Sequence, residues 1–318
     1  MISRMLLFLL ISCFLQAGAQ HIDNTAVYRF RPTEKSFRVI YENDLFTQTD
    51  RSYSQGVLVE FIHPSLLKSP ISKILVSPAG TALRSGITAE INAFTPQQIG
   101  SPYIQYTDQP FAATFLLKQF AITSDSVHKW QLVCSAGLGV VGPPALGKEI
   151  QVGLHRATNS IIPEGWPNQV SSDLLVNYTV AYSRTLLDVG KWFRINGDVS
   201  ATAGTPFTNA SAGFTGTIGW MDPAFSGIQK EVFRFHFFYQ PRFQAIAYDA
   251  TLQGGLFNRH SPYTFQQSEI VRVVSTQSAG IILNFRKLSL EYSLSAETPR
   301  FRNGYSHRYG TVHMGFYF

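Results

Sequence analysis

Apolar and polar residues alternate along most of the chain, with a period of two. Phe37, Val39 and Tyr41 alternate with Arg38 and Glu42, and the same pattern recurs up to the last residues. A period of two places the two sets of side chains on opposite faces of a β-strand. The pattern therefore predicts an all-β fold.

The polar positions of this pattern distinguish a membrane barrel from a water-soluble sandwich. They are rich in Ser, Thr, Gln, Asn and Gly with isolated charges, whereas the outer face of a soluble sandwich is highly charged. The opposite positions are aromatic or aliphatic up to Phe318, as in the terminal strands of bacterial outer-membrane barrels. This combination is typical of a barrel whose apolar face meets lipid and whose polar face lines the lumen.

About a dozen segments qualify as strands, and single-chain bacterial barrels have an even strand number. We predict one domain, 20–318, that forms a transmembrane antiparallel up-and-down β-barrel of about 12 strands, with 14 as the alternative. The candidate strands lie near 36–44, 54–63, 86–94, 111–122, 130–141, 149–156, 174–186, 191–204, 211–220, 231–247, 268–286 and 287–318, of which the last three are long enough to hold more than one strand.

Composition and the first residues indicate an exported protein. Charged residues make up 14% of the 318 residues, against about a quarter in an average soluble domain, and the mean hydropathy is +0.01. These values disfavour disorder, a coiled coil and a bundle of membrane helices. A basic start, the apolar run Met5–Phe14 and the small residues Ala17-Gly18-Ala19 predict a signal peptide at 1–19. We therefore expect the protein in the bacterial outer membrane.

The cysteine content disfavours a disulfide-stabilised fold, and the distribution of charge disfavours nucleic-acid binding. Cys13 lies in the predicted signal peptide and Cys134 stands alone, so no disulfide is expected within the mature chain. The net charge of +6 is spread over scattered Lys and Arg residues, without the basic cluster that nucleic-acid binding favours. We expect no nucleic-acid partner, and we expect a monomer.

The first candidate site is the pair Asn43-Asp44 at the end of a predicted strand. A carboxylate beside an amide oxygen offers the hard oxygen ligands that Ca²⁺ prefers. The alternative is a simple turn, because Asn and Asp dominate turns.

The second candidate site contains Gln151 and His155. In a strand over 149–156 these two side chains would share a face with Gly153, and His155 would point into the lumen or toward its mouth. A single His is most often structural. A water activated by His and aided by a cation is, however, the acyl-hydrolysis mechanism that these residue types could support.

At several segments, spread over nearly the whole mature chain, the sequence resembles the outer-membrane lipid A 3′-O-deacylases of the LpxR type. The segments are Asn43-Asp44, Asp50-Arg51-Ser52-Tyr53-Ser54-Gln55-Gly56, Thr95-Pro96, Asp108-Gln109-Pro110-Phe111-Ala112, Gly142-Pro143, Gln151 with His155, Gly165-Trp166 with Gln169, and Ala296-Glu297-Thr298-Pro299-Arg300-Phe301.

The resemblance implies a 12-stranded barrel with an active site near the extracellular rim, between the barrel wall and an outer loop. It implies calcium-dependent hydrolysis of the 3′-acyloxyacyl group of lipid A, so that lipopolysaccharide would be the partner. The roles it implies are His155 as the base that activates water, Asn43 and Asp44 as holders of Ca²⁺, and Gln151, Ser54 and Glu164 as further site residues.

Two other functional classes stay open at this point. A non-catalytic barrel, such as a small channel or an adhesin, would share the strand pattern. An outer-membrane phospholipase would share the barrel and the calcium but would use a Ser-His pair. Gln109 also stands where the family has Arg, so a cation for lipid A phosphate would be absent or would come from elsewhere, for instance from Lys118 or Arg84.

Overall fold

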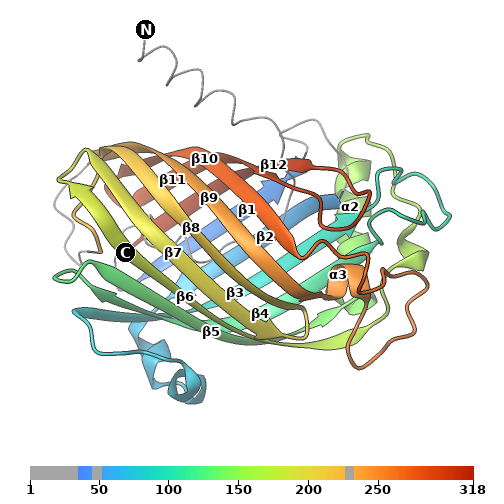
Figure 1. The fold of residues 1–318 in the computed structure, drawn as a ribbon, viewed down its shortest axis with the longest axis horizontal. Coiled ribbons are helices and arrows are strands. Elements are labelled where there is room, and N and C mark those ends of the chain that lie inside the picture. The colour runs from blue at the N-terminus through green and yellow to red at the C-terminus, as the bar shows by residue number, and fades with distance from the viewer. Residues whose placement is uncertain (1–34, 45–51, 226–232) are drawn as a thin grey trace, which may run out of the picture.

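The computed structural model describes residues 35–44, 52–225 and 233–318. Within them, twelve antiparallel strands form a closed barrel in which each strand pairs with its neighbours in the chain and β1 pairs with β12 (Figure 1). This confirms the predicted fold and strand number. The predicted signal peptide and the Asp50-Arg51 part of the first motif lie outside the described residues.

The strands and the helices of the loops have the following bounds. The strands are β1 Ser36–Asn43, β2 Ser52–Ile62, β3 Ala82–Thr95, β4 Ala112–Asp125, β5 Trp130–Val141, β6 Asp173–Val189, β7 Phe193–Gly204, β8 Phe207–Trp220, β9 Phe233–Asp249, β10 Val273–Phe285, β11 Leu288–Glu297 and β12 His307–Tyr317. The helices are α2 Gly147–Ala157, α3 Ala250–Gln253 and the 3₁₀ turns η3 Pro64–Lys68, η4 Pro70–Ile74, η5 Pro143–Ala145 and η6 Trp166–Asn168. In the described residues, none of the helices has the length and apolar character needed to cross a membrane.

The alternating residues face as the pattern predicts. Outward positions carry exposed apolar side chains, such as Leu117 (54% exposed) and Phe237 (50% exposed). Inward positions carry polar side chains, and Glu90 and Asn92 are fully buried. A belt of exposed apolar side chains around a polar interior is the arrangement expected of a barrel in lipid.

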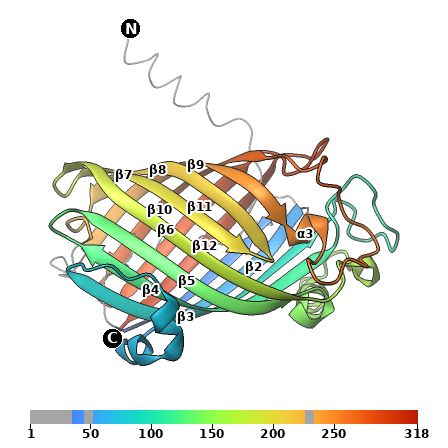
Figure 2. The ribbon, with the colours of Figure 1, turned by 60° about the horizontal axis from the view of Figure 1, so that its bottom comes forward.

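The loops show which end of the barrel faces outward from the cell. At one end lie residues 35 and 318, the short turns 126–129, 190–192 and 286–287, and one longer connection, 63–81, which contains η3 and η4. The opposite end carries the long connections 96–111, 142–172 and 250–272, with α2 and α3 (Figures 1 and 2). Outer-membrane barrels have short periplasmic turns and longer extracellular loops, so the end with α2 and α3 is extracellular.

The lumen is filled by polar side chains, several of which pair with one another. Lys118 pairs with Glu90, and the Asn92 amide donates to the same carboxylate at 2.7 Å. The Tyr53 hydroxyl donates to Glu42 at 2.9 Å. Because burying a polar group is costly unless it is paired, these contacts stabilise the lumen. Lys118 and Arg84, which were suggested as cations for a lipid phosphate, are buried inside the barrel.

One predicted strand is wrong, because 149–156 belongs to helix α2. The period of two covered only Gln151–His155, which is too short to exclude a helix in which these residues lie one turn apart. Glu149 in the first turn and Arg156 in the last turn also suit the helix dipole. The strand count stays at twelve because 287–318 contains both β11 and β12.

Breaking the pair between Lys118 and Glu90 should cost much of the barrel's stability. Glu90→Gln leaves the buried ammonium without its counter-charge, for which we expect a loss of about 3–5 kcal/mol. Unfolding of the two proteins by guanidinium in detergent measures this loss of unfolding free energy. Lys129→Gln is the control, because that side chain is 46% exposed in its pair with Asp188 and exposed pairs contribute at most about 1 kcal/mol. Equal losses for the two variants would contradict a packed ionic lumen.

Candidate active site

Helix α2 covers the outer wall of the barrel at the extracellular end and packs against β3 and β4. Ala93 and Ala113 face outward there, since they alternate with the inward Asn92 and Thr114. An apolar cluster fixes the loop 142–172 to this wall. Its members are Ala93, Ile99, Phe111, Ala113, Ala145 and Trp166, with Phe115, Val140 and Val152 packed against them.

The start of α2 lies unusually close to the wall. A Cβ on Gly147 would stand 2.4 Å from the Cβ of Ala113 and 2.8 Å from the Trp166 ring. Only glycine fits this contact without a shift of its neighbours. The helix therefore has a defined distance from the wall, and its side chains have a defined height above it.

Gln151 is held by the Trp166 indole, whose Nε1 donates to the Gln151 Oε1 at 2.9 Å. Both side chains are buried. The Gln151 Nε2 has no hydrogen-bond partner in the described part of the chain. A buried donor without a partner costs about 1–3 kcal/mol, so this amide is prepared to donate to a ligand.

His155 lies one turn beyond Gln151 on α2 and is half-buried. Its Nδ1 is 2.6 Å from the carbonyl oxygen of Ile161. A carbonyl only accepts, so Nδ1 donates, and in the neutral ring the lone pair is then on Nε2. That tautomer is the one a general base requires. Because α2 is a helix that packs on the outer side of β3 and β4, the strand in which His155 would point into the lumen or toward its mouth does not form.

Asn43 lies on the outer wall, at the end of β1. It pairs across the strands with Gln55, and its Nδ2 donates to the Tyr41 hydroxyl at 2.9 Å. Tyr41 faces outward like Phe37, four residues before it. Asp44 follows, is buried, and lies close enough to Tyr41 to interact electrostatically with its phenol.

A β-bulge brings Ser54 to the same outer face. The pairing of β2 with β3 shifts between Tyr53 and Gln55, so Ser54 is the extra residue. Its Oγ lies 2.5 Å from the Thr95 Oγ1, and both residues are buried. Bulges often redirect a side chain beside an active site. Here Tyr53 stays in the lumen while the next side chain reaches the outside.

Glu164 lies in the loop between α2 and η6. Its backbone N–H donates to the carbonyl of Ile99 at 2.9 Å, which joins the two extracellular loops. The side chain is exposed and makes no hydrogen bond to another described residue. This carboxylate is therefore open to solvent at the extracellular end of the barrel.

The structure thus brings the candidate residues to one end and one face of the barrel. Gln151 and His155 lie over β3 and β4, while Asn43 and Ser54 lie on the adjoining outer wall of β1 to β3. Sequence reasoning gave no role to Tyr41 and Thr95. The alternation of the strand, which places Tyr41 on the same face as Asn43, was the signal that could have identified Tyr41.

The oxygen donors here suit a hard cation better than a transition metal. The described residues contain no group of three or more His, Cys, Asp or Glu side chains that could hold a metal ion. Asp44 supplies a carboxylate oxygen, Asn43 an amide oxygen and Ser54 a hydroxyl oxygen. Ca²⁺ accepts such a mixed oxygen set and needs few charged ligands.

Comparison with known proteins supports this fold over nearly its whole length. The structure "LpxR from Salmonella typhimurium" matches with a TM-score of 0.73 at 19% identity, covering 89% of this chain and 100% of that one. The β domain of the Bordetella autotransporter BrkA matches with a TM-score of 0.47 at 8% identity, covering 90% and 100%. No curated protein matches the sequence.

The family described as "Outer membrane protein LpxR" matches residues 5–318. This confirms the resemblance seen in the sequence motifs and the expected location in the bacterial outer membrane. The chain belongs to the LpxR family of outer-membrane proteins.

Proposed function

We propose that this protein is a lipid A deacylase that hydrolyses the ester of the 3′-linked acyloxyacyl group. Membership of the LpxR family supports the substrate class. The observation that carries the proposal is the hydrogen bond between His155 Nδ1 and the Ile161 carbonyl, on a helix that lies on the lipid-facing wall. An ester of an outer-leaflet lipid can reach that wall without entering the lumen.

In the proposed reaction, His155 Nε2 removes a proton from a water molecule as its oxygen attacks the ester carbonyl. The bond between the carbonyl carbon and the sugar oxygen then breaks, and the imidazolium returns the proton to the departing sugar oxygen. The products are the free 3′-hydroxyl and the released acyloxyacyl acid. The Ile161 carbonyl keeps the ring oriented and accepts the Nδ1 proton throughout.

The other candidate residues act on the charge that develops on the ester oxygen. Gln151 Nε2 is a buried donor that can bind the carbonyl oxygen or the other oxygen of the ester, and Trp166 holds the amide in place. Ser54 and Thr95 form a hydroxyl pair on the outer wall of β2 and β3. Asn43 and Asp44 would hold Ca²⁺, whose positive charge would stabilise the negative charge that develops on the ester carbonyl oxygen. Glu164 lies at the edge, where it can act on the water or the sugar.

Two observations favour this mechanism over the alternatives. Within the described chain, the His155 ring is hydrogen-bonded to a carbonyl and to no serine hydroxyl, which supports an activated water rather than the Ser-His pair of a phospholipase. Glu90, Asn92 and Thr88 are fully buried in the lumen, which supports a filled barrel rather than a channel.

Replacing His155 should abolish deacylation. We expect His155→Ala to lower the rate by about 10²–10⁴-fold, the usual contribution of a general base. Expression in a host that makes lipid A, followed by mass measurement of lipid A, reports the loss of one acyloxyacyl group. His128→Ala is the control, because this exposed His lies in the periplasmic β4–β5 turn. Unchanged lipid A with correctly inserted wild-type protein would refute the proposed function.

Calcium should bind at Asn43 and Asp44. We expect Asp44→Asn, which keeps the shape but removes the charge, to weaken the binding of radioactive Ca²⁺ to the detergent-solubilised protein by about tenfold or more, a change of about 1.4 kcal/mol. Chelation of Ca²⁺ should stop the wild-type reaction, and added Ca²⁺ should restore it. Asp188→Asn, at the periplasmic end, should leave binding unchanged. If Asp44→Asn bound Ca²⁺ as tightly as the wild type does, the cation site would lie elsewhere.

The height of α2 above the wall should control activity. In Gly147→Ala the added methyl clashes with Ala113, and we expect about 1–3 kcal/mol of destabilisation and a fall in deacylation of tenfold or more, because small misplacements of catalytic groups are costly. Gly153→Ala is the matched control in the same helix, since a Cβ there meets open space. It should be active and slightly more stable. Equal activity of the two variants would contradict this role of the contact.

A further inference from the structure

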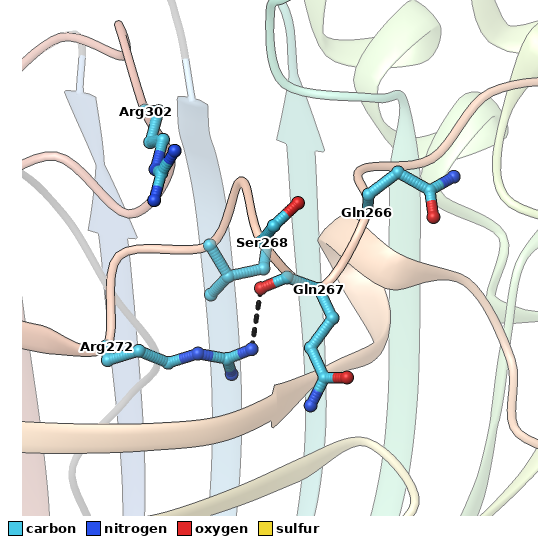
Figure 3. A pocket seen from close by; sticks show the side chains of 6 residues that line it. Gln266, Gln267, Ser268, Arg272 and Arg302 are labelled. Atoms are coloured by element: carbon cyan, nitrogen blue, oxygen red, sulfur yellow. Dashed lines mark hydrogen bonds between the residues drawn. The ribbon is translucent and has the colours of Figure 1, made fainter.

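A pocket of about 560 Å³ lies on the extracellular rim, away from α2 (Figure 3). It is formed where the β9–β10 connection meets the β11–β12 connection. Its lining residues are Gln266, Gln267, Ser268, Ile270, Arg272 and Arg302. All but Ile270 carry polar or charged side chains, so the pocket suits a polar ligand.

The two connections that form the pocket are joined by backbone hydrogen bonds. Ile270 and Phe301 form an isolated β-bridge, and the Arg302 N–H donates to the Glu269 carbonyl at 2.7 Å. Below the bridge, the rings of Phe265 and Phe301 stack with centroids 4.4 Å apart. Both lining arginines are therefore attached to a fixed backbone.

The guanidinium of Arg272 is held by neutral acceptors. Its Nη1 donates to the carbonyls of Ile246 (3.2 Å) and Ala247 (2.9 Å), and its Nη2 donates to that of Gln267 (2.6 Å), a bond drawn in Figure 3. Carbonyls orient the group without neutralising it. Arg272 thus presents a fixed positive charge at the pocket.

This charge differs from that of the arginines that pair with a carboxylate. Arg38 pairs with Glu60, and Arg300 pairs with Asp249, both buried. Neither Arg272 nor Arg302 forms an ion pair with a carboxylate in the described residues. The acid next to the pocket in sequence, Glu269, accepts a hydrogen bond from the Gln266 N–H at 2.6 Å. The pocket therefore carries a net positive charge.

The cations that the sequence suggested for a lipid A phosphate do not line this pocket. Lys118 and Arg84 are buried in the lumen. Gln109, which replaces a family arginine, is buried and donates to the carbonyls of Pro110 and Thr251, each at 3.1 Å. An anionic group in this pocket would meet Arg272 and Arg302.

We propose that this pocket binds a saccharide that carries a phosphate or carboxylate group. Arginine forks match both oxyanions, while Gln266, Gln267 and Ser268 supply donors and acceptors for sugar hydroxyls. The site is separate from the catalytic wall under α2. It does not rest on the proposed deacylation, since such a saccharide can bind whether or not an ester is cleaved.

Calorimetric titration of the full-length protein in neutral detergent at low salt tests the proposal. The probes are the fully deacylated, phosphorylated saccharide of lipopolysaccharide, maltotriose and inorganic phosphate. We expect the phosphorylated saccharide to bind more tightly than inorganic phosphate and maltotriose not to bind. Because this saccharide has no ester, failure to bind would leave the proposed deacylase function untouched.

Arg302→Gln should weaken binding of the phosphorylated saccharide about tenfold, the effect of losing one charge-assisted hydrogen bond. Its side chain is exposed, so the fold should persist, which circular dichroism checks. Arg272→Lys keeps the charge but loses the fork and should show a smaller loss. Arg286→Gln removes the same charge in the periplasmic β10–β11 turn and should bind as wild type. Three outcomes would overturn the proposal. They are unchanged binding by Arg302→Gln, an equal loss of binding in Arg286→Gln, and equally tight binding of inorganic phosphate and of the phosphorylated saccharide.

Discussion

The structure depends on one constraint: every backbone N–H and C=O inside the hydrocarbon layer must be hydrogen-bonded within the protein. The pairing of β1 with β12 satisfies it by removing the last two strand edges. Once the sheet is closed, each strand has one face toward lipid and one toward the lumen. Charged groups are then forced inward, where Glu90 and Lys118 neutralise each other. The same constraint forbids an uncovered polar site on the middle of the outer wall.

Under the proposed function a polar site for a lipid ester lies on the outside of the barrel, and two local exceptions to the regular alternation permit polar groups there. The bulge at Ser54 directs a hydroxyl outward beside Thr95. Helix α2 then covers this end of the wall, so that Gln151 is buried under protein rather than exposed to hydrocarbon. The periplasmic end shows the same solution: outward-facing Gln119 is covered by the η3–η4 segment, where Ser69 donates to its Oε1 at 2.6 Å. Outward polar groups therefore occur where a loop shields them.

This explains which features could be predicted from the sequence. The period of two is a property of each strand by itself, so the barrel and the strand number were predictable from runs such as Phe37 to Glu42. The position of Asn43 at a strand end was also predictable. The helical state of Gln151 and His155 was not, because their conformation depends on Trp166 and on the wall residues Ala93 and Ala113, which come from distant parts of the chain. Likewise, Lys118 has no local signal that it points inward to Glu90.

The distribution of charge follows from the same constraint and links the lumen to the rim. Inside the barrel a charge has little water to solvate it, and a carboxylate partner, such as Glu60 for Arg38, offsets that cost. At the extracellular rim water lowers the cost, and a guanidinium such as that of Arg272 can be oriented by carbonyls alone. A positive charge that no carboxylate neutralises therefore costs less at the rim than in the lumen. The two proposed functions are then separated on the outer surface: the lipid-facing wall under α2 would meet acyl esters, while the rim at β9 to β12 would meet the polar, anionic part of molecules at the membrane surface.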